Sequence, residues 1–240
     1  MQTVLDEPRP FLFHRDQYYR MRELGWFADQ KVELIGGQVV VHPGPEVEPP
    51  GPEMFPTRHW TREEYFQMLD LGWFDGHRVE LIGGEVLEMA AQFDLHAAAV
   101  DDTADALILV FGAGYWVRRQ ASLDLSPYGV PDPDVSVVTG SRRQAARTIQ
   151  TKALLVVEAS DSSLSYDRNA KGSLYAAAGI LDYWIVNLVH RQLEVYRNPM
   201  VDNTALHGFA YADKAILIPG DFVNPLALPG ASIAVADLLP

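Results

Sequence analysis

The chain contains no cysteine among its 240 residues, so it can form neither a disulfide nor a thiolate metal site. This absence is consistent with a reducing cytoplasm, and we expect a cytoplasmic protein. No apolar run approaches the ~20 residues that a membrane-spanning helix requires. The first residues, MQTVLDEPRPFLF, place acidic residues and prolines where a signal peptide needs basic residues followed by an apolar run. We therefore expect a soluble protein without membrane association.

Positive charge is scarce. Lysine and arginine total 19 against 32 aspartates and glutamates, so the formal net charge is 19 − 32 = −13. Such a charge repels polyanions on average, and any nucleic-acid binding must depend on a local site. The length fits one large domain, or one domain with an appendage.

One segment of the sequence occurs twice. LGWFADQKVELIGG (Leu24–Gly37) returns 47 positions later as LGWFDGHRVELIGG (Leu71–Gly84), and 14 of 27 positions are identical between His14–Val40 and Thr61–Leu87. Each copy predicts a helix followed by a hairpin. Thr61 and Glu64 match a capping box, and the Gly-Gly pair suits a two-residue turn. Two copies are too few for a solenoid, so we interpret the repeat as a partial duplication.

The first copy is followed by VHPGPEVEPPGPEMFP, whose prolines exclude a helix or a sheet interior. We therefore predict a linker over residues 42–56 and two parts of the chain: an extension over 1–54 and a main domain over 55–240. We expect Val32–Val41 to form a hairpin at a sheet edge or subunit contact, far from Asp134, with Glu33 outside any active site.

The remainder of the chain alternates strand and helix signals, which indicates a mixed α/β domain. The predicted helices are His96 to about Val110 and Asp167–Ala178, the second ended by Gly179. Strands are predicted at Tyr115–Leu125, Asp134–Val138, Leu154–Glu158, Tyr183–Asn187 and Gln192–Arg197. SRRQAARTIQTK reads as a basic connection, and the tail from about Ala215 as short edge strands.

Four charged residues are candidates for a catalytic or metal-binding role: Asp134, Glu158, Lys171 and, earlier in the chain, Glu80. Asp134 opens an apolar strand, Glu158 closes the apolar run LLVVE, and Lys171 lies on the helix that follows. A charge after four apolar residues is costly unless it is paired or bound to a metal. Structural roles account for the same residues: Asp134 can end a turn, Lys171 can pair with Asp167 four residues earlier, and Glu80 can pair with Arg78.

The order and spacing of several motifs resemble the Uma-two family of restriction endonucleases, within the PD-(D/E)XK nuclease superfamily. The motifs are VELIGGEV, a helix carrying His96, PDVSVV, LLVVEASDSS, DRNAKGSLYAAAGILDYWIVN, LEVYR and GDFVNPLALPG, and they cover about Phe55 to Pro240. The resemblance implies a restriction-endonuclease-like mixed β-sheet core flanked by helices, with the duplicated helix and hairpin as an N-terminal extension.

The resemblance also implies a site. Asp134 and Glu158 would hold Mg²⁺ or Mn²⁺, with Glu80 as a third carboxylate. Ser160 stands where the superfamily usually has its lysine, so Lys171 would supply the ammonium group. His96 matches a family histidine, although a core or helix-start role is equally open for it, and Asp167 is a further candidate.

The leading hypothesis is therefore a metal-dependent endonuclease that hydrolyses DNA phosphodiester bonds, working as a homodimer. Six basic residues are candidates for phosphate contacts, or else belong to solvated loops: Arg118, Arg119, Arg142, Arg143, Arg147 and Lys152. The alternatives are a catalytically quiet, nuclease-like protein-interaction module, and a hydrolase of a small phosphorylated metabolite.

Overall fold

The computed structural model describes residues 7–42, 55–125 and 129–240. Its centre is a six-stranded sheet in the order β11-β10-β9-β8-β7-β6. Only β8 and β9 are parallel, and the other neighbours are antiparallel. The strands are β6 (Tyr115–Arg119), β7 (Val135–Thr139), β8 (Leu155–Ser160), β9 (Asp182–Asn187), β10 (Gln192–Val201) and β11 (Phe209–Leu217).

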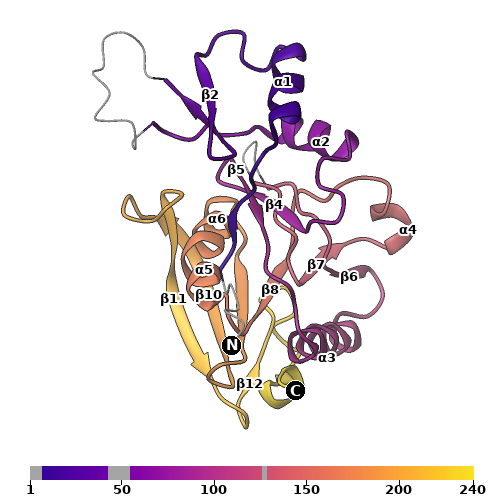
Figure 1. Cartoon of the computed structure of the whole chain (residues 1–240). Helices are drawn as coiled ribbons and strands as arrows, with labels where there is room; N and C mark the ends of the chain where they lie inside the picture. Colours follow the sequence, from indigo (N-terminus) through magenta and orange to yellow (C-terminus); the bar gives the residue numbers. More distant parts are fainter. Residues whose placement is uncertain (1–6, 43–54, 126–128) are drawn as a thin grey trace.

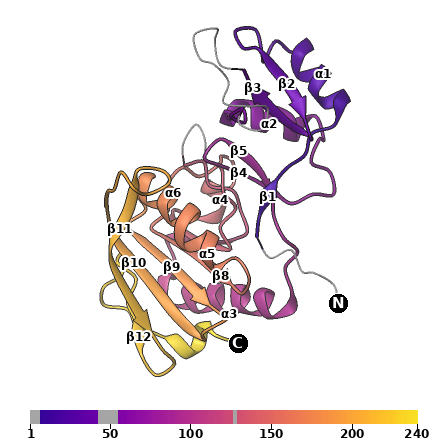
Figure 2. The ribbon, with the colours of Figure 1, turned by 60° about the vertical axis from the view of Figure 1, so that its left-hand side comes forward.

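Helices cover both faces of this sheet (Figures 1 and 2). On one face, α3 (Asp94–Phe111) and η2 (Val235–Leu238) pack against alternate strand residues such as Val137, Val157 and Trp184. On the other face lies a continuous helical segment made of α5 (Leu164–Tyr166), η1 (Asp167–Lys171) and α6 (Gly172–Ala177). This segment links the parallel strands β8 and β9, because parallel neighbours need a crossover connection. The mixed β-sheet core flanked by helices that the sequence predicts is confirmed.

Several predicted elements differ at their ends. The predicted strand over Tyr115–Leu125 stops at Arg119, because Gln120 adopts a positive φ of 44° that turns the chain. The predicted helix over Asp167–Ala178 is present, but its first part, η1, is a π turn. The basic connection contains a short helix, α4 (Arg142–Ala145), and the last long strand begins at Phe209 rather than near Ala215. Two short strands, β12 (Phe222–Val223) and β13 (Ile233–Ala234), pair with each other near the end of the chain.

The two copies of the repeat form two similar units. The first unit, residues 7–42, contains β1 (Arg9–Pro10), α1 (Arg15–Glu23), β2 (Val32–Ile35) and β3 (Gln38–Val41). The second unit, residues 55–89, contains α2 (Arg62–Asp70), β4 (Val79–Ile82) and β5 (Glu85–Glu88). The predicted capping box is present in α2, where the Thr61 N–H donates to Glu64 Oε2 at 2.9 Å and the Glu64 N–H donates to Thr61 Oγ1 at 3.3 Å.

The Gly-Gly turns have a steric as well as a conformational reason. Gly84 has φ +85°, and a Cβ there would lie 2.7 Å from the Cβ of His59. Gly37, its counterpart in the first unit, has φ +84° and the same close approach, 2.8 Å, to the Cβ of Leu12. Glycine is therefore required at both turns for its backbone conformation and for lack of a side chain.

The hairpin predicted at Val32–Val41 is observed as β2 and β3, which pair with each other outside the six-stranded sheet. Glu33 lies on it with its side chain 54% exposed, 3.1 Å from His42. Most of the predicted linker, residues 43–54, lies outside the described residues. Among the helices that the structure describes, none is both long enough and apolar enough to cross a membrane.

Candidate active site

Two carboxylates meet where β7 begins and β8 nears its end. Asp134 directly precedes β7, and antiparallel pairing of Val135 with Val157 places it beside Glu158 of β8. Glu158 faces the helical segment η1–α6, where it contacts Lys171 and Tyr175, whereas Asp134 also meets His96 from the first turn of α3. The exposed fractions of Asp134 and Glu158 are only 4% and 2%.

The backbone fixes the relation between the two acids. The Asp134 N–H donates to Glu158 Oε2 at 3.3 Å, and the Ala159 N–H donates to Asp134 Oδ2 at 3.0 Å. Each carboxylate therefore accepts a hydrogen bond from the strand that carries the other. The pair is held by the sheet itself rather than by mobile side chains.

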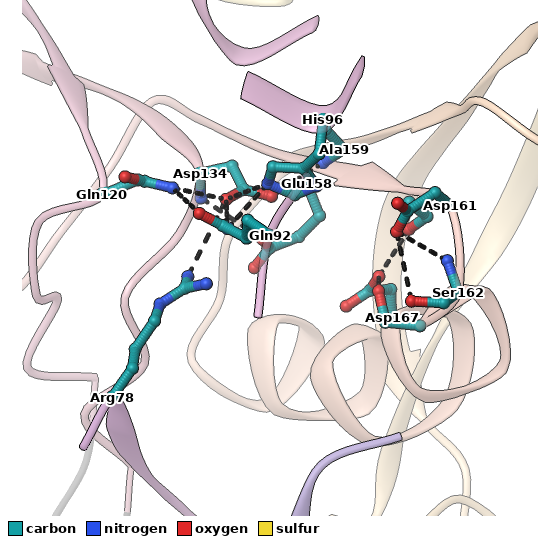
Figure 3. Close-up of polar contacts among 12 residues, drawn as sticks. Arg78, Gln92, His96, Gln120, Asp134, Glu158, Ala159, Asp161, Ser162 and Asp167 are labelled. Carbon is teal, nitrogen blue, oxygen red and sulfur yellow. Dashed lines mark hydrogen bonds and ion pairs between the residues drawn. The ribbon is translucent and has the colours of Figure 1, made fainter. Parts of the chain in front are cut away.

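Several polar side chains contact the second carboxylate oxygen of Asp134, Oδ1 (Figure 3). His96 Nε2 and Gln92 Nε2 both lie 3.1 Å from Asp134 Oδ1, and Gln120 Nε2 lies at 3.5 Å. Burial alone would raise the pKa of the Asp134 carboxyl, but the hydrogen bond and charge of His96 and the charge of Lys171 lower it to about 2. Burial lowers the pKa of His96, yet the hydrogen bond and charge of Asp134, together with the charge of Asp161, leave the pKa raised.

Lys171 is a buried cation between two buried glutamates. Its Nζ lies 3.0 Å from Glu158 Oε1 and 3.2 Å from Glu80 Oε2. The Tyr175 hydroxyl also donates to Glu158 Oε1, at 2.6 Å. Burial raises the pKa of Glu80 to about 6 and that of Glu158 well above its ordinary value, despite the charge of Lys171. Burial lowers the pKa of Lys171, but the charges of Glu158, Glu80 and Asp167 act together against it and leave the pKa raised.

The π turn η1 carries Lys171 at its last position. In a π turn the hydrogen bond spans five residues instead of four, and such turns occur frequently at functional sites. The Asp167 carbonyl in this turn accepts an additional hydrogen bond from the Tyr183 hydroxyl at 2.9 Å. The turn is thus tied to β9, and Lys171 approaches Glu158 from the helical layer.

Asp167 is a further buried acid of this turn. Its Oδ2 accepts hydrogen bonds from the Ser160 hydroxyl at 2.5 Å and from the Ser163 hydroxyl at 2.6 Å. Burial raises the pKa of this carboxyl, and the charge of Lys171 only partly opposes that effect. Ser160 therefore donates a hydrogen bond to Asp167. It occupies the position at which the superfamily usually has its lysine.

These side chains border a surface cavity. Its walls include Asp134, Glu158, His96, Asp167, Lys171 and Arg78. Glu80 is fully buried behind Lys171 and does not reach the cavity wall. Among the described residues, no group of three or more histidine, aspartate and glutamate side chains is arranged to hold a metal ion.

The predicted basic residues are not gathered at the cavity. Arg142 and Arg143 lie on α4, which follows β7, whereas Asp134 precedes that strand, and Arg147 and Lys152 come later in the same connection. Arg119 forms ion pairs with Asp101 and Asp105 of α3. Arg118 is buried and donates to the Ser122 carbonyl.

Four other residues at the site were not predicted from the sequence: Arg78, Gln92, Gln120 and Tyr175. Arg78 Nη2 lies 4.0 Å from Asp134 Oδ1. It stands two residues before Glu80 in the sequence, and this spacing was the signal from which a place near the site could have been predicted. Gln92 lies outside the predicted elements, and Gln120 lies in the predicted strand Tyr115–Leu125, where alternation alone does not mark a site residue.

A six-stranded mixed sheet with helices on both faces, and two acids at adjoining strand ends, defines a fold of the restriction-endonuclease-like class. Residues 62–236 match the model of the Uma2 family, described as "putative restriction endonuclease". The chain belongs to this family.

A solved structure supports the fold. The chain is similar to a protein from Anabaena variabilis described as "a putative nuclease belonging to DUF820", with a TM-score of 0.54 and 14% identity. The similarity covers 74% of this chain and 96% of the other. No match was found among curated proteins.

Proposed function

We propose that the protein is a Mg²⁺- or Mn²⁺-dependent endonuclease that hydrolyses DNA phosphodiester bonds at the cavity bordered by Asp134 and Glu158. One observation carries this proposal: four buried carboxyl groups lie close to Lys171 and His96. The four are Glu80, Asp134, Glu158 and Asp167. Buried carboxylates are costly without compensating positive charge, and Lys171, His96 and the nearby Arg78 supply only part of it.

The donor set fits a hard divalent cation. Carboxylate oxygens are the ligands that Mg²⁺ and Mn²⁺ prefer, and Mg²⁺ commonly binds one or two carboxylates while keeping water and substrate phosphate oxygens. Asp134 and Glu158 would hold the ion, since both border the cavity. Such an ion lowers the pKa of a bound water and stabilises negative charge on a phosphoryl oxygen.

The chain's own residues have distinct roles in this proposal. Lys171 borders the cavity and holds the Glu158 carboxylate, so its positive charge lies where a phosphate would bind. Glu80 orients Lys171 from behind. His96 fixes Asp134, and Arg78 offers a phosphate contact from the cavity wall.

Membership of the family supports a nuclease activity for this protein, whereas the net charge of −13 is unfavourable for binding DNA. The proposed DNA contacts are therefore local, and Arg78 is placed better for them than the residues of α4. Homodimer formation, as expected from the sequence, and a cytoplasmic location remain parts of the proposal.

The test is plasmid nicking with Mg²⁺ or Mn²⁺, together with calorimetric titration of Mn²⁺. We expect wild type to bind Mn²⁺ and nick DNA, and Glu158→Gln to lose both properties while keeping its fold by circular dichroism. Asp102→Asn, an exposed acid on α3, is the matched control and is expected to behave as wild type. If wild type neither binds the metal nor cuts single- or double-stranded DNA, the quiet interaction module becomes the better hypothesis.

A further inference from the structure

The two units of the repeat meet through equivalent positions. The Trp26 and Trp73 rings lie 5.8 Å apart between centroids, and those of Phe13 and Trp60 lie 5.2 Å apart. Both pairs are separated by the repeat distance of 47 residues. In a two-fold interface, the residues that meet their own equivalents are those near the axis. A pseudo-two-fold axis therefore passes between the units at these aromatic pairs.

The backbone contacts away from the axis are reciprocal. The Phe11 N–H of the first unit donates to the Val86 carbonyl of the second at 2.8 Å. Its counterpart, the Arg58 N–H of the second unit, donates to the Val39 carbonyl of the first at 2.7 Å. In each unit, the extended segment that precedes the helix thus pairs with the hairpin of the other unit. Figure 2 shows this for β1, which lies along β5.

Neighbouring strand positions repeat this relation. Pro10 pairs with Leu87, and the equivalent Thr57 pairs with Val40. Two reciprocal pairs of backbone contacts, in register, show that the strand exchange is symmetric.

Side chains follow the same relation. The Phe11 ring lies 5.0 Å from the Phe74 ring, and the Arg58 guanidinium lies 5.3 Å from the centre of the Phe27 ring. Phe11 is equivalent to Arg58, and Phe27 is equivalent to Phe74. Residue i contacts j and j contacts i, which is the property of an isologous interface.

We infer that the two units form an intramolecular counterpart of a strand-exchanged two-fold dimer, and that this face of the second unit is a self-association surface. In this chain the first unit occupies that surface. When the first unit is displaced, the replacement partner is the second unit of another copy of this chain.

A second copy fits because the second unit carries the residues that the interface uses. Trp73 and Phe74 replace the identical Trp26 and Phe27, and Val86 replaces Val39. Arg58 can stack on the Phe74 of a second copy as it stacks on Phe27 here. The larger change near the axis is Trp60 in place of Phe13.

The exchanged strand also reaches the active-site cavity. Pro8, directly before β1, borders the cavity together with Met89, and Arg9 forms a 3.3 Å ion pair with Glu88. At the equivalent place on the first unit, the rings of Phe55 and His42 pack 4.4 Å apart. The leading segment of the first unit therefore borders the active-site cavity beside the second unit.

The test displaces the first unit within the full-length chain. Phe13→Asp combined with Trp26→Asp changes the first unit only, and we expect light scattering to show twice the mass of wild type. Adding Trp73→Asp removes the exposed face from the second unit and is expected to restore the wild-type mass. These readouts do not require nuclease activity, so they stand or fall separately from the proposed function.

A single cysteine tests the axis, because the chain has none of its own. In the Phe13→Asp, Trp26→Asp background, Trp73→Cys is expected to form an intermolecular disulfide, since this residue meets its own equivalent across the axis. Leu109→Cys, at a position that is 85% exposed on α3, is the control and is expected to remain unlinked. An unchanged mass, association that persists after Trp73→Asp, or equal cross-linking of both cysteines would overturn the inference.

Discussion

The Glu80→Gln variant is expected to be more stable than wild type, and the advantage is expected to be larger at neutral or alkaline pH than at acid pH. Glu80 is fully buried, and burial raises its pKa from 4.5 to about 6 although Lys171 lies beside it. Glutamine has nearly the same shape and carries no charge. The variant therefore resembles wild type with a permanently protonated Glu80, and its amide oxygen can still accept from Lys171.

The sign and size follow from proton linkage. Because the folded-state pKa is the higher one, the contribution of Glu80 to stability is fully present below pH 4.5 and is lost as the pH rises through 6. The difference between 4.5 and about 6 corresponds to about 2 kcal/mol at 1.36 kcal/mol for each pKa unit. The advantage of the variant should thus be about 2 kcal/mol at pH 8, and clearly smaller at pH 5.

Urea denaturation at pH 5 and pH 8 measures this difference directly, with Asp102→Asn as a variant that leaves the site untouched. Nicking activity should fall in Glu80→Gln, since Lys171 loses one of its two charged partners. A variant that is less stable than wild type at pH 8, or equally stabilised at both pH values, would refute the account of Glu80 as a carboxylate ionised at a cost.

Three further variants test neighbouring parts of the molecule. Lys171→Met should lower the free energy of unfolding by about 3–5 kcal/mol at pH 8, because two buried glutamates lose their cation. The loss should be smaller at pH 5, where their raised pKa values let them take up protons, and a loss independent of pH in urea titrations would contradict this. Tyr175→Phe removes the 2.6 Å hydrogen bond to Glu158 and should cost about 1.5–3 kcal/mol by the same assay, whereas exposed Tyr19→Phe should change stability by less than about 0.5 kcal/mol. Gly84→Ala should cost about 1–3 kcal/mol more than Gly76→Ala in thermal unfolding, because both glycines have positive φ but only a Cβ at position 84 meets another atom within 4 Å; equal losses would show that backbone strain alone matters.

The sequence by itself determined the layer architecture. Apolar runs such as LLVVE, and the helix closed by Gly179, are local patterns, and local patterns predict elements with their approximate limits. The Gly-Gly turns were equally predictable, because positive φ has a residue signature. The end of β6 was not predictable, since Gln120 takes a positive φ that glutamine rarely adopts.

The candidate site was predicted in part. Asp134, Glu158 and Lys171 were singled out by charge beside apolar strands, and the structure brings them together with Glu80. Arg142 and Arg143 were singled out by composition alone, and composition does not state at which end of a strand a residue lies.

Only the tertiary structure decided how the duplicated segment is used. Its sequence predicted two helix-hairpin units, but not that each lends a strand to the other, because pairing between distant segments leaves no local periodicity. The π turn that carries Lys171 likewise accepts a hydrogen bond from the hydroxyl of Tyr183, which lies on another element. The sequence set what each segment forms by itself, and the packing of remote segments set which side chains meet.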